Sequence, residues 1–444
     1  MPSVRRTDPS PASIVPPSFA ATAGLSRRSF LKSAAIGGAL LGAPGLLSAC
    51  GGGDGGSNTT TVTFGMNESG DIPPAERLRA MADAFAKESG LTVKRNEVSH
   101  NTFQENINTY LQGNPDDVFT WFAGFRMNQF AEQGLISDLS EVWPIDGISD
   151  SFKEASTASD GKQYFVPKDY YPWAVFYRKS VFEKNGYEVP TTLDDLTALA
   201  DKMESDDIVP FAFGDKDGWP AMGTFDILNM RINGFQFHMD LMAGEKEWDS
   251  SEVKQVFETW RSLLPYHQPD ALGRTWQEAA QSLGKGDSGM YLFGTFVVDG
   301  IPEVEEDLDF FTFPELDSSI GATALDAPID GFCVSADPDN PEGAMDFVAF
   351  LGTAEAADAA NATGVPFIAA NENADTSGYS ELQRKSAEVV SQATDIAQFL
   401  DRDTRADFAA TVIIPSLQTF LSDPDDIDGV TSSIQSQKVS IFGG

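Results

Sequence analysis

Strands and helices alternate along this sequence, and that order limits the possible folds more than any other feature. Residues 61–64 alternate in polarity as a strand does, and residues 75–89 carry apolar side chains at helical spacing before Gly90. Residues 91–93 predict a second strand and residues 117–121 a third, with a helical stretch between them. Sequential strands linked by helices form a mainly parallel sheet that the helices cover. We therefore expect an α/β fold.

The same pattern continues beyond the length of one domain. The chain has 444 residues, more than one hydrophobic core usually contains, so we expect two domains. Later in the chain, residues 165–177 are apolar and aromatic, Thr192 begins a capping box, and Asn340 precedes a proline as helix caps often do. The helix that Asn340 opens is predicted to end near Gly352.

Acidic residues greatly outnumber basic ones. The sequence has 67 Asp and Glu against 30 Lys and Arg, for a net charge of −37. Nucleic-acid phosphate and anionic lipid would be repelled, so we predict no nucleic-acid partner. Only Cys50 and Cys333 are present, which excludes a disulfide framework and a cysteine-based zinc site.

Signatures of the common enzyme classes are missing from the sequence. No His-Glu-x-x-His, Gly-x-Ser-x-Gly or Gly-Lys-Ser/Thr phosphate loop occurs. The three histidines, His100, His238 and His267, are far apart, and nothing singles out a pair of carboxylates such as a glycosidase uses. We therefore predict no catalytic residue, no metal ligand and no cofactor.

The first fifty residues predict export rather than a folded domain. Arg27-Arg28 precedes an apolar stretch, residues 33–47, that is too short to span a bilayer, as in twin-arginine export signals. The segment ends in Leu-Ser-Ala-Cys50-Gly, which looks like a bacterial lipobox. We predict a twin-arginine lipoprotein signal peptide over residues 1–49, lipid on Cys50 and a flexible tether over residues 50–61. The alternative is a plain export signal with an incidental cysteine.

Aromatic side chains cluster at predicted strand ends and loops. Ligands of open α/β sheets bind outside the carboxyl ends of the strands. A pyranose stacks its C–H face on such rings, while polar side chains bind its hydroxyls. The alternative is that the rings fill the cores, which we expect for Trp260, Phe257 and Phe347. We assign to the binding site the rings next to Gly, Pro or Asp, namely Trp121, Tyr171, Trp173 and Trp219.

Several stretches follow one another in the order found in a known family. They include a small-x-Pro-Asp-Val motif at 113–118 and a Gly-Lys-x-Tyr-x-x-Pro motif at 161–167, with further matches at 131–139, 176–182 and 190–196. The chain resembles the extracellular solute-binding proteins of ABC importers, specifically the maltose-binding-protein-like family that carries sugars and oligosaccharides. Arg178 and Leu193 replace the family's usual Asn and Trp, at positions peripheral to the sugar.

This resemblance implies a type II periplasmic-binding-protein-like fold with two α/β lobes, mostly parallel sheets and hinge crossings. It implies crossings near 169–173 and 311–314 and a return near 356, so we expect one lobe from residues 62–169 plus 314–355 and the other from 170–313 plus 356–444. It also implies a monomer that captures a sugar between the lobes and delivers it to the transmembrane subunits of an ABC permease. The lipid on Cys50 would hold this receptor at the outer face of the cytoplasmic membrane.

Carried over residue by residue, the resemblance implies a set of ligand-binding side chains in the cleft. These are Asn67, Glu68, Trp121, Arg126, Asp169, Tyr170, Tyr171, Trp173, Asp217, Trp219, Phe296, Asp330 and Arg402. For Arg126 and Arg402, a salt bridge on a lobe surface is an equal alternative.

Two other functions remain open at this point. A tethered carbohydrate-active enzyme would need two carboxylates about 5–9 Å apart across the cleft. A binding protein of the same fold for another polar solute, such as a polyamine, would fit the acidic composition because acidic clefts attract cations. The sequence does not identify the sugar, its anomer or its chain length.

Overall fold

The computed structural model describes residues 60–364 and 367–443. The predicted signal peptide, Cys50 and the tether up to residue 59 lie outside the described residues. Within the described ranges, no helix combines the length and the apolar character needed to cross a membrane.

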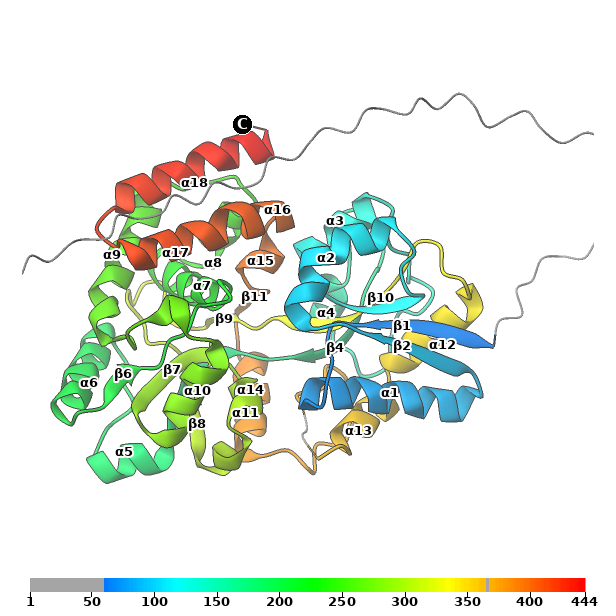
Figure 1. Ribbon diagram of the computed structural model, residues 1–444, viewed down its shortest axis with the longest axis horizontal. Helices are drawn as coiled ribbons and strands as arrows, with labels where there is room; N and C mark the ends of the chain where they lie inside the picture. The colour runs from blue at the N-terminus through cyan, green and yellow to red at the C-terminus, as the bar shows by residue number, and fades with distance from the viewer. Residues whose placement is uncertain (1–59, 365–366, 444) are drawn as a thin grey trace, which may run out of the picture. The chain divides into compact units, whose positions relative to one another are not determined.

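The first lobe is built on a five-stranded sheet with the strand order β2-β1-β3-β10-β4 (Figure 1). Its strands are β1 (Thr61–Met66), β2 (Thr92–Glu97), β3 (Val118–Phe122), β4 (Val166–Tyr170) and β10 (Ile329–Val334). Its helices are α1 (Pro73–Ser89), α2 (His100–Gln112), α3 (Phe125–Glu132), α4 (Asp150–Ala155), α12 (Pro341–Leu351) and α13 (Ala354–Asn361).

The second lobe is built on a four-stranded sheet with the order β6-β7-β5-β8. Its strands are β5 (Trp173–Arg178), β6 (Val209–Phe211), β7 (Ser288–Gly294) and β8 (Leu308–Phe311). Its longer helices are α5 (Lys179–Asn185), α6 (Leu193–Ser205), α7 (Pro220–Asn233), α8 (Phe235–Met242), α9 (Ser251–Leu263), α10 (Trp276–Lys285), α14 (Glu381–Ser391), α17 (Ile414–Ser422) and α18 (Ile427–Phe442). Shorter helical turns are η1 (Leu264–Tyr266), η2 (Ala271–Gly273), α11 (Val297–Gly300), η3 (Pro302–Asp307), α15 (Leu400–Asp403), α16 (Ala406–Phe408) and η4 (Ala409–Ile413).

Strand directions in both sheets are mixed, whereas we expected mostly parallel sheets. The β1–β2, β1–β3 and β6–β7 pairs are parallel, as strands joined through helices should be. The strands that follow or precede a crossing between lobes run the other way: β10 is antiparallel to β3 and β4, and β5 is antiparallel to β7 and β8. A strand that enters from the other lobe is not joined to its neighbour through a helix of the same lobe, so it need not run parallel to that neighbour.

Among the residues that the structure describes, three segments connect the lobes. The first is the short link at Tyr171 and Pro172 between β4 and β5. The second runs from β8 through β9 (Ala324–Asp326) into β10, and β9 pairs in parallel with β11 (Asp395–Ala397). The third leads from α13 to α14.

The return to the second lobe comes later than we expected. Helix α13 packs against α1, and Phe367 and Ala374 share an apolar core with β1 and α12. The first lobe therefore includes residues beyond 355, where the sequence analysis placed its end. The alanine-rich sequence of α13 does not indicate which lobe the helix packs against.

Local signals at helix ends agree with the structure. The Thr192 hydroxyl accepts from the Asp195 amide in a capping box, as predicted. Asn340 caps α12, which ends at Leu351, next to the predicted stop at Gly352. Trp260, Phe257 and Phe347 are fully buried in the cores, as expected.

Candidate functional site

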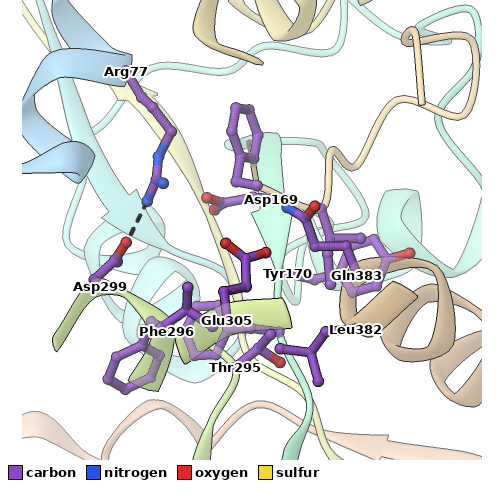
Figure 2. Close-up of a pocket in the computed structure, with 13 residues that line it drawn as sticks. Arg77, Asp169, Tyr170, Thr295, Phe296, Asp299, Glu305, Leu382 and Gln383 are labelled. Carbon is purple, nitrogen blue, oxygen red and sulfur yellow. Dashed lines mark ion pairs between the residues drawn. The ribbon is translucent and has the colours of Figure 1, made fainter. Parts of the chain in front are cut away.

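A pocket lies between the two lobes beside the first crossing (Figure 2). Arg77 and Asp169 line it from the first lobe, and Phe296, Asp299 and Glu305 line it from the second. Arg77 and Asp299 point toward each other across the pocket, with a nitrogen and an oxygen 3.7 Å apart. Charged groups and an aromatic ring therefore face the same space.

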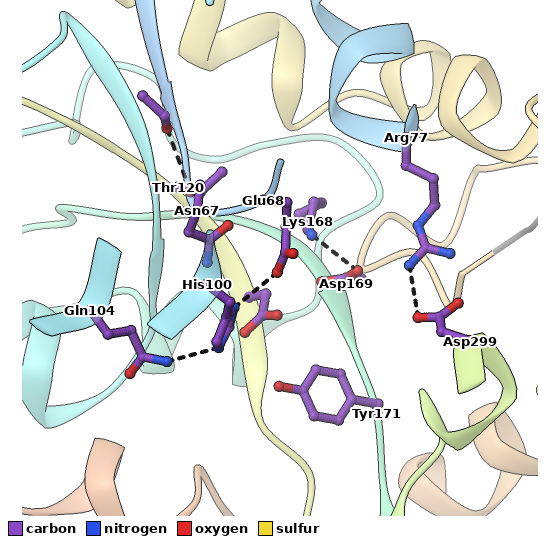
Figure 3. A network of polar contacts seen from close by, with 12 residues as sticks. Asn67, Glu68, Arg77, His100, Gln104, Thr120, Lys168, Asp169, Tyr171 and Asp299 are labelled. Atoms are coloured by element: carbon purple, nitrogen blue, oxygen red, sulfur yellow. Dashed lines mark hydrogen bonds and ion pairs between the residues drawn. The ribbon is translucent and has the colours of Figure 1, made fainter. Parts of the chain in front are cut away.

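A chain of polar contacts leads from this region to the second lobe, and Figure 3 shows its first part, from Glu68 through His100 to Gln104. Nδ1 of His100 lies 2.9 Å from Oε1 of Glu68, and Nε2 of His100 lies 2.7 Å from Nε2 of Gln104. Arg126 Nη1 donates to Gln104 Oε1 at 2.8 Å and to Asp401 Oδ2 at 3.1 Å. We call these five residues the Glu68–Asp401 chain. Four of its members belong to the first lobe, and Asp401 belongs to α15, which packs on α7 and α8 of the second lobe.

Arg402 joins three separate segments at the base of the site. Its guanidinium donates to Asp330 Oδ1 on β10 at 2.8 Å and to the Tyr171 hydroxyl on the first crossing at 2.9 Å. It also lies 3.9 Å from the centroid of the Phe122 ring. Although burial lowers the pKa of Arg402, its contacts with the Tyr171 hydroxyl and the Asp330 carboxylate raise it by more, so the guanidinium stays ionised.

The second lobe contributes partly exposed aromatic rings centred on Phe296. The Phe296 ring lies 5.1 Å from Tyr171, 5.6 Å from Trp276 and 6.1 Å from Trp219, measured between ring centroids. We call these four rings the aromatic face. Gly294 is needed behind it, because a side-chain Cβ there would come within 2.2 Å of the Phe296 ring.

Trp121 and Trp173, which we assigned to the site, are almost completely buried. Their exposed fractions are 1% and 2%. Trp121 packs on Phe130 inside the first lobe, with Arg126 against its ring at 4.7 Å. Trp173 is stacked on Phe399 inside the second lobe. Both rings pack beneath the residues of the site, because they lie on β3 and β5, which are buried on both faces. A direct contact of either ring with a ligand stays a prediction.

The polar residues assigned to the first lobe lie close to the pocket. Asn67 is buried, and its backbone N–H donates to Thr120 at 2.9 Å. Asp169 forms an ion pair with Lys168 at 3.2 Å. Burial raises the pKa of Asp169 to about 6, against the opposing charge of Lys168.

The other assigned residues differ in whether they line the pocket. Tyr170 lines the pocket and packs on Phe152 with centroids 5.2 Å apart. Asp217 accepts a hydrogen bond of 3.4 Å from Asn101 at the start of α2, which joins the two lobes. Arg126 and Arg402 are buried and form ion pairs with Asp401 and Asp330, as the salt-bridge alternative expects, and direct contact of either with a ligand stays a prediction.

Sequence reasoning missed several residues of this region. His100, Gln104 and Trp276 were not assigned to the site, nor were Arg77 and Asp299. A usable signal existed for two of them: His100 begins a helix directly after β2, and Gln104 follows one turn later on the same face. Nothing local marked Asp299, whose contact with Arg77 joins segments more than two hundred residues apart.

Comparison with known proteins places this geometry in a family. Residues 80–389 match the family of bacterial extracellular solute-binding proteins. A crystal structure of the bacterial solute receptor AcbH, described as having an exclusive preference for β-D-galactopyranose, is 41% identical, with a TM-score of 0.83 over 86% of this chain and 99% of that one. The receptor therefore matches almost along its whole length.

Curated relatives are more distant. An uncharacterized ABC transporter extracellular-binding protein of Pyrococcus horikoshii is 28% identical over 63% of this chain and 65% of its own length. An alpha-glucosides-binding periplasmic protein of Rhizobium meliloti is 26% identical over 61% of this chain and 64% of its own. The matched region spans about half to two thirds of the first curated relatives, from 49% to 65%. By the match over most of its length, the chain belongs to the bacterial extracellular solute-binding protein family, with the two-lobe fold of that family.

Proposed function

We propose that this protein is the sugar-binding receptor of an ABC importer and that its ligand is a single pyranose of the galactose type. The ligand would lie in the interlobe site and pass to the transmembrane permease subunits. The observation that carries the proposal is the pairing of an aromatic face on the second lobe with charged hydrogen-bonding groups on the first.

The aromatic face suits the apolar side of a sugar ring. Phe296, Trp219, Trp276 and Tyr171 are each partly exposed, unlike the fully buried rings of the cores. A pyranose placed on them would lose contact with water over its C–H face at little cost, because those groups make no hydrogen bonds. The rings of Tyr171 and Trp276 are steeply inclined to the Phe296 ring, so together they form a shallow concave surface rather than a flat one.

The first lobe suits the hydroxyl rim. Carboxylates accept from hydroxyl groups, and guanidinium groups donate to them, so each hydroxyl can find a charged partner. Glu68, Asp169 and Asp330 supply acceptors, and Lys168 and Arg402 supply donors. The likeness to a galactopyranose receptor at 41% identity supports one sugar ring of this class as the ligand.

The arrangement does not favour the other two functions. A polyamine site needs unbalanced acidic groups, but here Arg402 pairs with Asp330 and Lys168 pairs with Asp169. An enzyme would need a proton donor and a nucleophile set across the sugar, and the relatives matched are binding proteins.

Closure of the lobes on the sugar would be aided by contacts that join them. Arg126–Asp401, Arg402–Asp330 and Arg77–Asp299 each link a residue of one lobe to a residue of the other. A ligand that touches both lobes shifts the population toward this closed arrangement. The permease would then meet a closed, loaded receptor.

Isothermal titration calorimetry with D-galactose, D-glucose, D-xylose and a set of oligosaccharides tests the proposal. We expect saturable binding of galactose, much weaker binding of the oligosaccharides, and unchanged sugar recovered afterwards. Absence of heat with every sugar would overturn the sugar assignment, and release of altered sugar would overturn the binding-only role.

The anchor belongs to the proposal as well. We propose that Cys50 carries lipid after export of the folded protein and removal of residues 1–49. Cys50→Ser in the host should move the protein from the membrane fraction to the medium. Retention of that variant on the membrane would show that another feature holds it there.

A further inference from the structure

The donor and acceptor roles along the Glu68–Asp401 chain determine which nitrogen of His100 carries the proton. A guanidinium group can only donate, so the amide oxygen of Gln104 has to face Arg126. The NH₂ group of Gln104 then faces Nε2 of His100, which therefore accepts a hydrogen bond and carries no proton. The only proton of the ring lies on Nδ1, from which it is donated to Glu68.

The position of His100 in the fold supports the neutral ring. His100 is the first residue of α2, where the helix dipole disfavours positive charge. Arg402 on α15 also faces the ring, and its charge opposes protonation. Arg126 on α3 lies beyond Gln104.

Other charges act in the opposite direction. Burial lowers the pKa of His100, but the hydrogen bond and charge of Glu68, which follows β1, together with the charge of Asp330 on β10, raise it above its ordinary value. The raised pKa favours the charged ring, whereas the hydrogen bond from Gln104 to Nε2 requires the neutral one. A proton on Nε2 would meet the NH₂ group of Gln104, so protonation requires the amide to turn and release Arg126.

We infer that His100 is a positioning residue for the proposed sugar site: Gln104 and Arg126 hold it as the neutral tautomer with its proton on Nδ1, and this tautomer fixes Glu68 as an acceptor for a ligand hydroxyl. The part of this inference that concerns the ligand rests on the proposed function. Glu68 keeps 18% of its side chain exposed, and its bond to His100 uses Oε1. The other end of the chain is the ion pair between Arg126 and Asp401, so the state of His100 is linked to the contact between the lobes.

The tautomer can be read directly by nuclear magnetic resonance on the full chain labelled with ¹⁵N-histidine and carrying no histidine tag. The sequence has three histidines. His238 is buried and His267 is partly buried, and this burial lowers their pKa values to about 3 and about 4, so both stay neutral above about pH 5. The remaining histidine signal is therefore that of His100, and its loss in His100→Asn identifies it.

We expect that signal, followed from acid to alkaline pH, to show the Nδ1–H form wherever the ring is neutral. Gln104→Glu places a carboxylate that can accept from Arg126 and from His100 Nε2–H together, so His100 should remain charged to a distinctly higher pH. A neutral ring with its proton on Nε2 in the wild type, or an unchanged titration in Gln104→Glu, would overturn the tautomer assignment.

Sugar affinity tests the positioning role separately. His100→Ala should weaken binding about tenfold, the effect of losing one hydrogen bond to a charged group. His100→Asn keeps a donor near the Nδ1 position and should restore most of the affinity. Asn106→Ala, on the exposed face of the same helix, is the matched control and should leave binding unchanged.

The outcomes separate the two proposals. If the wild-type protein binds no sugar, the proposed function fails and the tautomer measurement still decides the arrangement around His100. If the sugar binds and His100→Ala binds it as tightly as wild type, the positioning role is wrong while the proposed function stands.

Discussion

The two lobes present opposite kinds of surface to the site between them. The first lobe offers ionised groups in ion pairs and hydrogen bonds, such as Glu68, Asp169 and Asp330. The second offers the aromatic face around Phe296. A sugar ring has the same two-sided character, with C–H groups on its faces and hydroxyls on its rim. The comparison teaches that each lobe needs to match only one aspect of the ligand.

The two surfaces also arise differently. On the first lobe, Glu68 follows the carboxyl end of β1, where ligand sites of α/β sheets lie, and His100 begins α2, while Asp169 and Asp330 lie on β4 and β10. The groups of the second lobe come from the turn after β7 and the starts of α7 and α10. The main exception is Arg402 on α15, which carries a charge from the second lobe into the polar surface of the first, and Asp299 and Glu305 of the second lobe also line the pocket.

The largest expected effect follows from removing that exception. Arg402→Ala should lower the free energy of unfolding by about 3 kcal/mol, because it leaves the Asp330 carboxylate without its buried partner. Chemical denaturation measures this loss. The matched control is Arg405→Ala, since Arg405 forms an exposed pair with Asp407 and should matter by less than about 1 kcal/mol. Equal losses in the two variants would contradict the larger contribution to stability that we assign to the Arg402–Asp330 pair.

Removing the centre of the aromatic face should come next. Phe296→Ala should weaken sugar binding by about 2 kcal/mol, or roughly thirtyfold, as truncation of a central aromatic contact commonly does. Calorimetry measures the change. Phe237→Ala, which removes a partly buried ring on α8 away from the site, should bind as wild type does. Similar affinities in the two variants would argue that the rings only fill space.

The polar surface should be distinguished from the aromatic one by pH. Asp169 has a pKa of about 6 in the folded protein, above the value of about 3.9 expected on unfolding. The folded state therefore binds the Asp169 proton more tightly than the unfolded state does. The stability that this protonated side chain contributes is present below about pH 4 and is lost as the pH rises through 6. We expect a loss of about 1–2 kcal/mol over that interval.

Denaturation at several pH values measures this contribution of Asp169. Asp169→Asn should remove it from the pH profile, because the amide cannot ionise. Phe296→Ala should keep the wild-type profile, because no ring of the aromatic face titrates in this range. A profile of Asp169→Asn that still falls between pH 4 and 6 as the wild type does would assign the effect to other groups.

The smallest effect concerns the contact between Arg77 and Asp299. Asp299→Asn should weaken sugar binding by only about two- to threefold, because a partly solvated ion pair at 3.7 Å contributes less than about 1 kcal/mol to closure. The difference from wild type should shrink in high salt. Glu303→Gln, an exposed change on the neighbouring turn η3, is the control. An effect as large as that of Phe296→Ala would mean that charge, and not ring contact, dominates the second lobe.

Much of the fold could be predicted because its signals are local. The strand at 61–64 became β1, the helix at 75–89 became α1, and the caps at Thr192 and Asn340 are present. The candidate site was predicted only in part. Tyr171, Trp219 and Phe296 are partly exposed together as expected, while Trp121 and Trp173 are buried although their neighbours in the sequence look just as suited to a site.

The sequence by itself determined the order of strands and helices, their ends and the family to which the chain belongs, because periodicity, capping and short motifs act over a few residues. Only the tertiary structure decided which rings remain exposed and which polar side chains meet. Arg126 and Asp401 are 275 positions apart, and Glu68 and His100 are 32 apart. No local pattern encodes such a pairing, since it depends on how two lobes built from interleaved segments bring distant loops to one place.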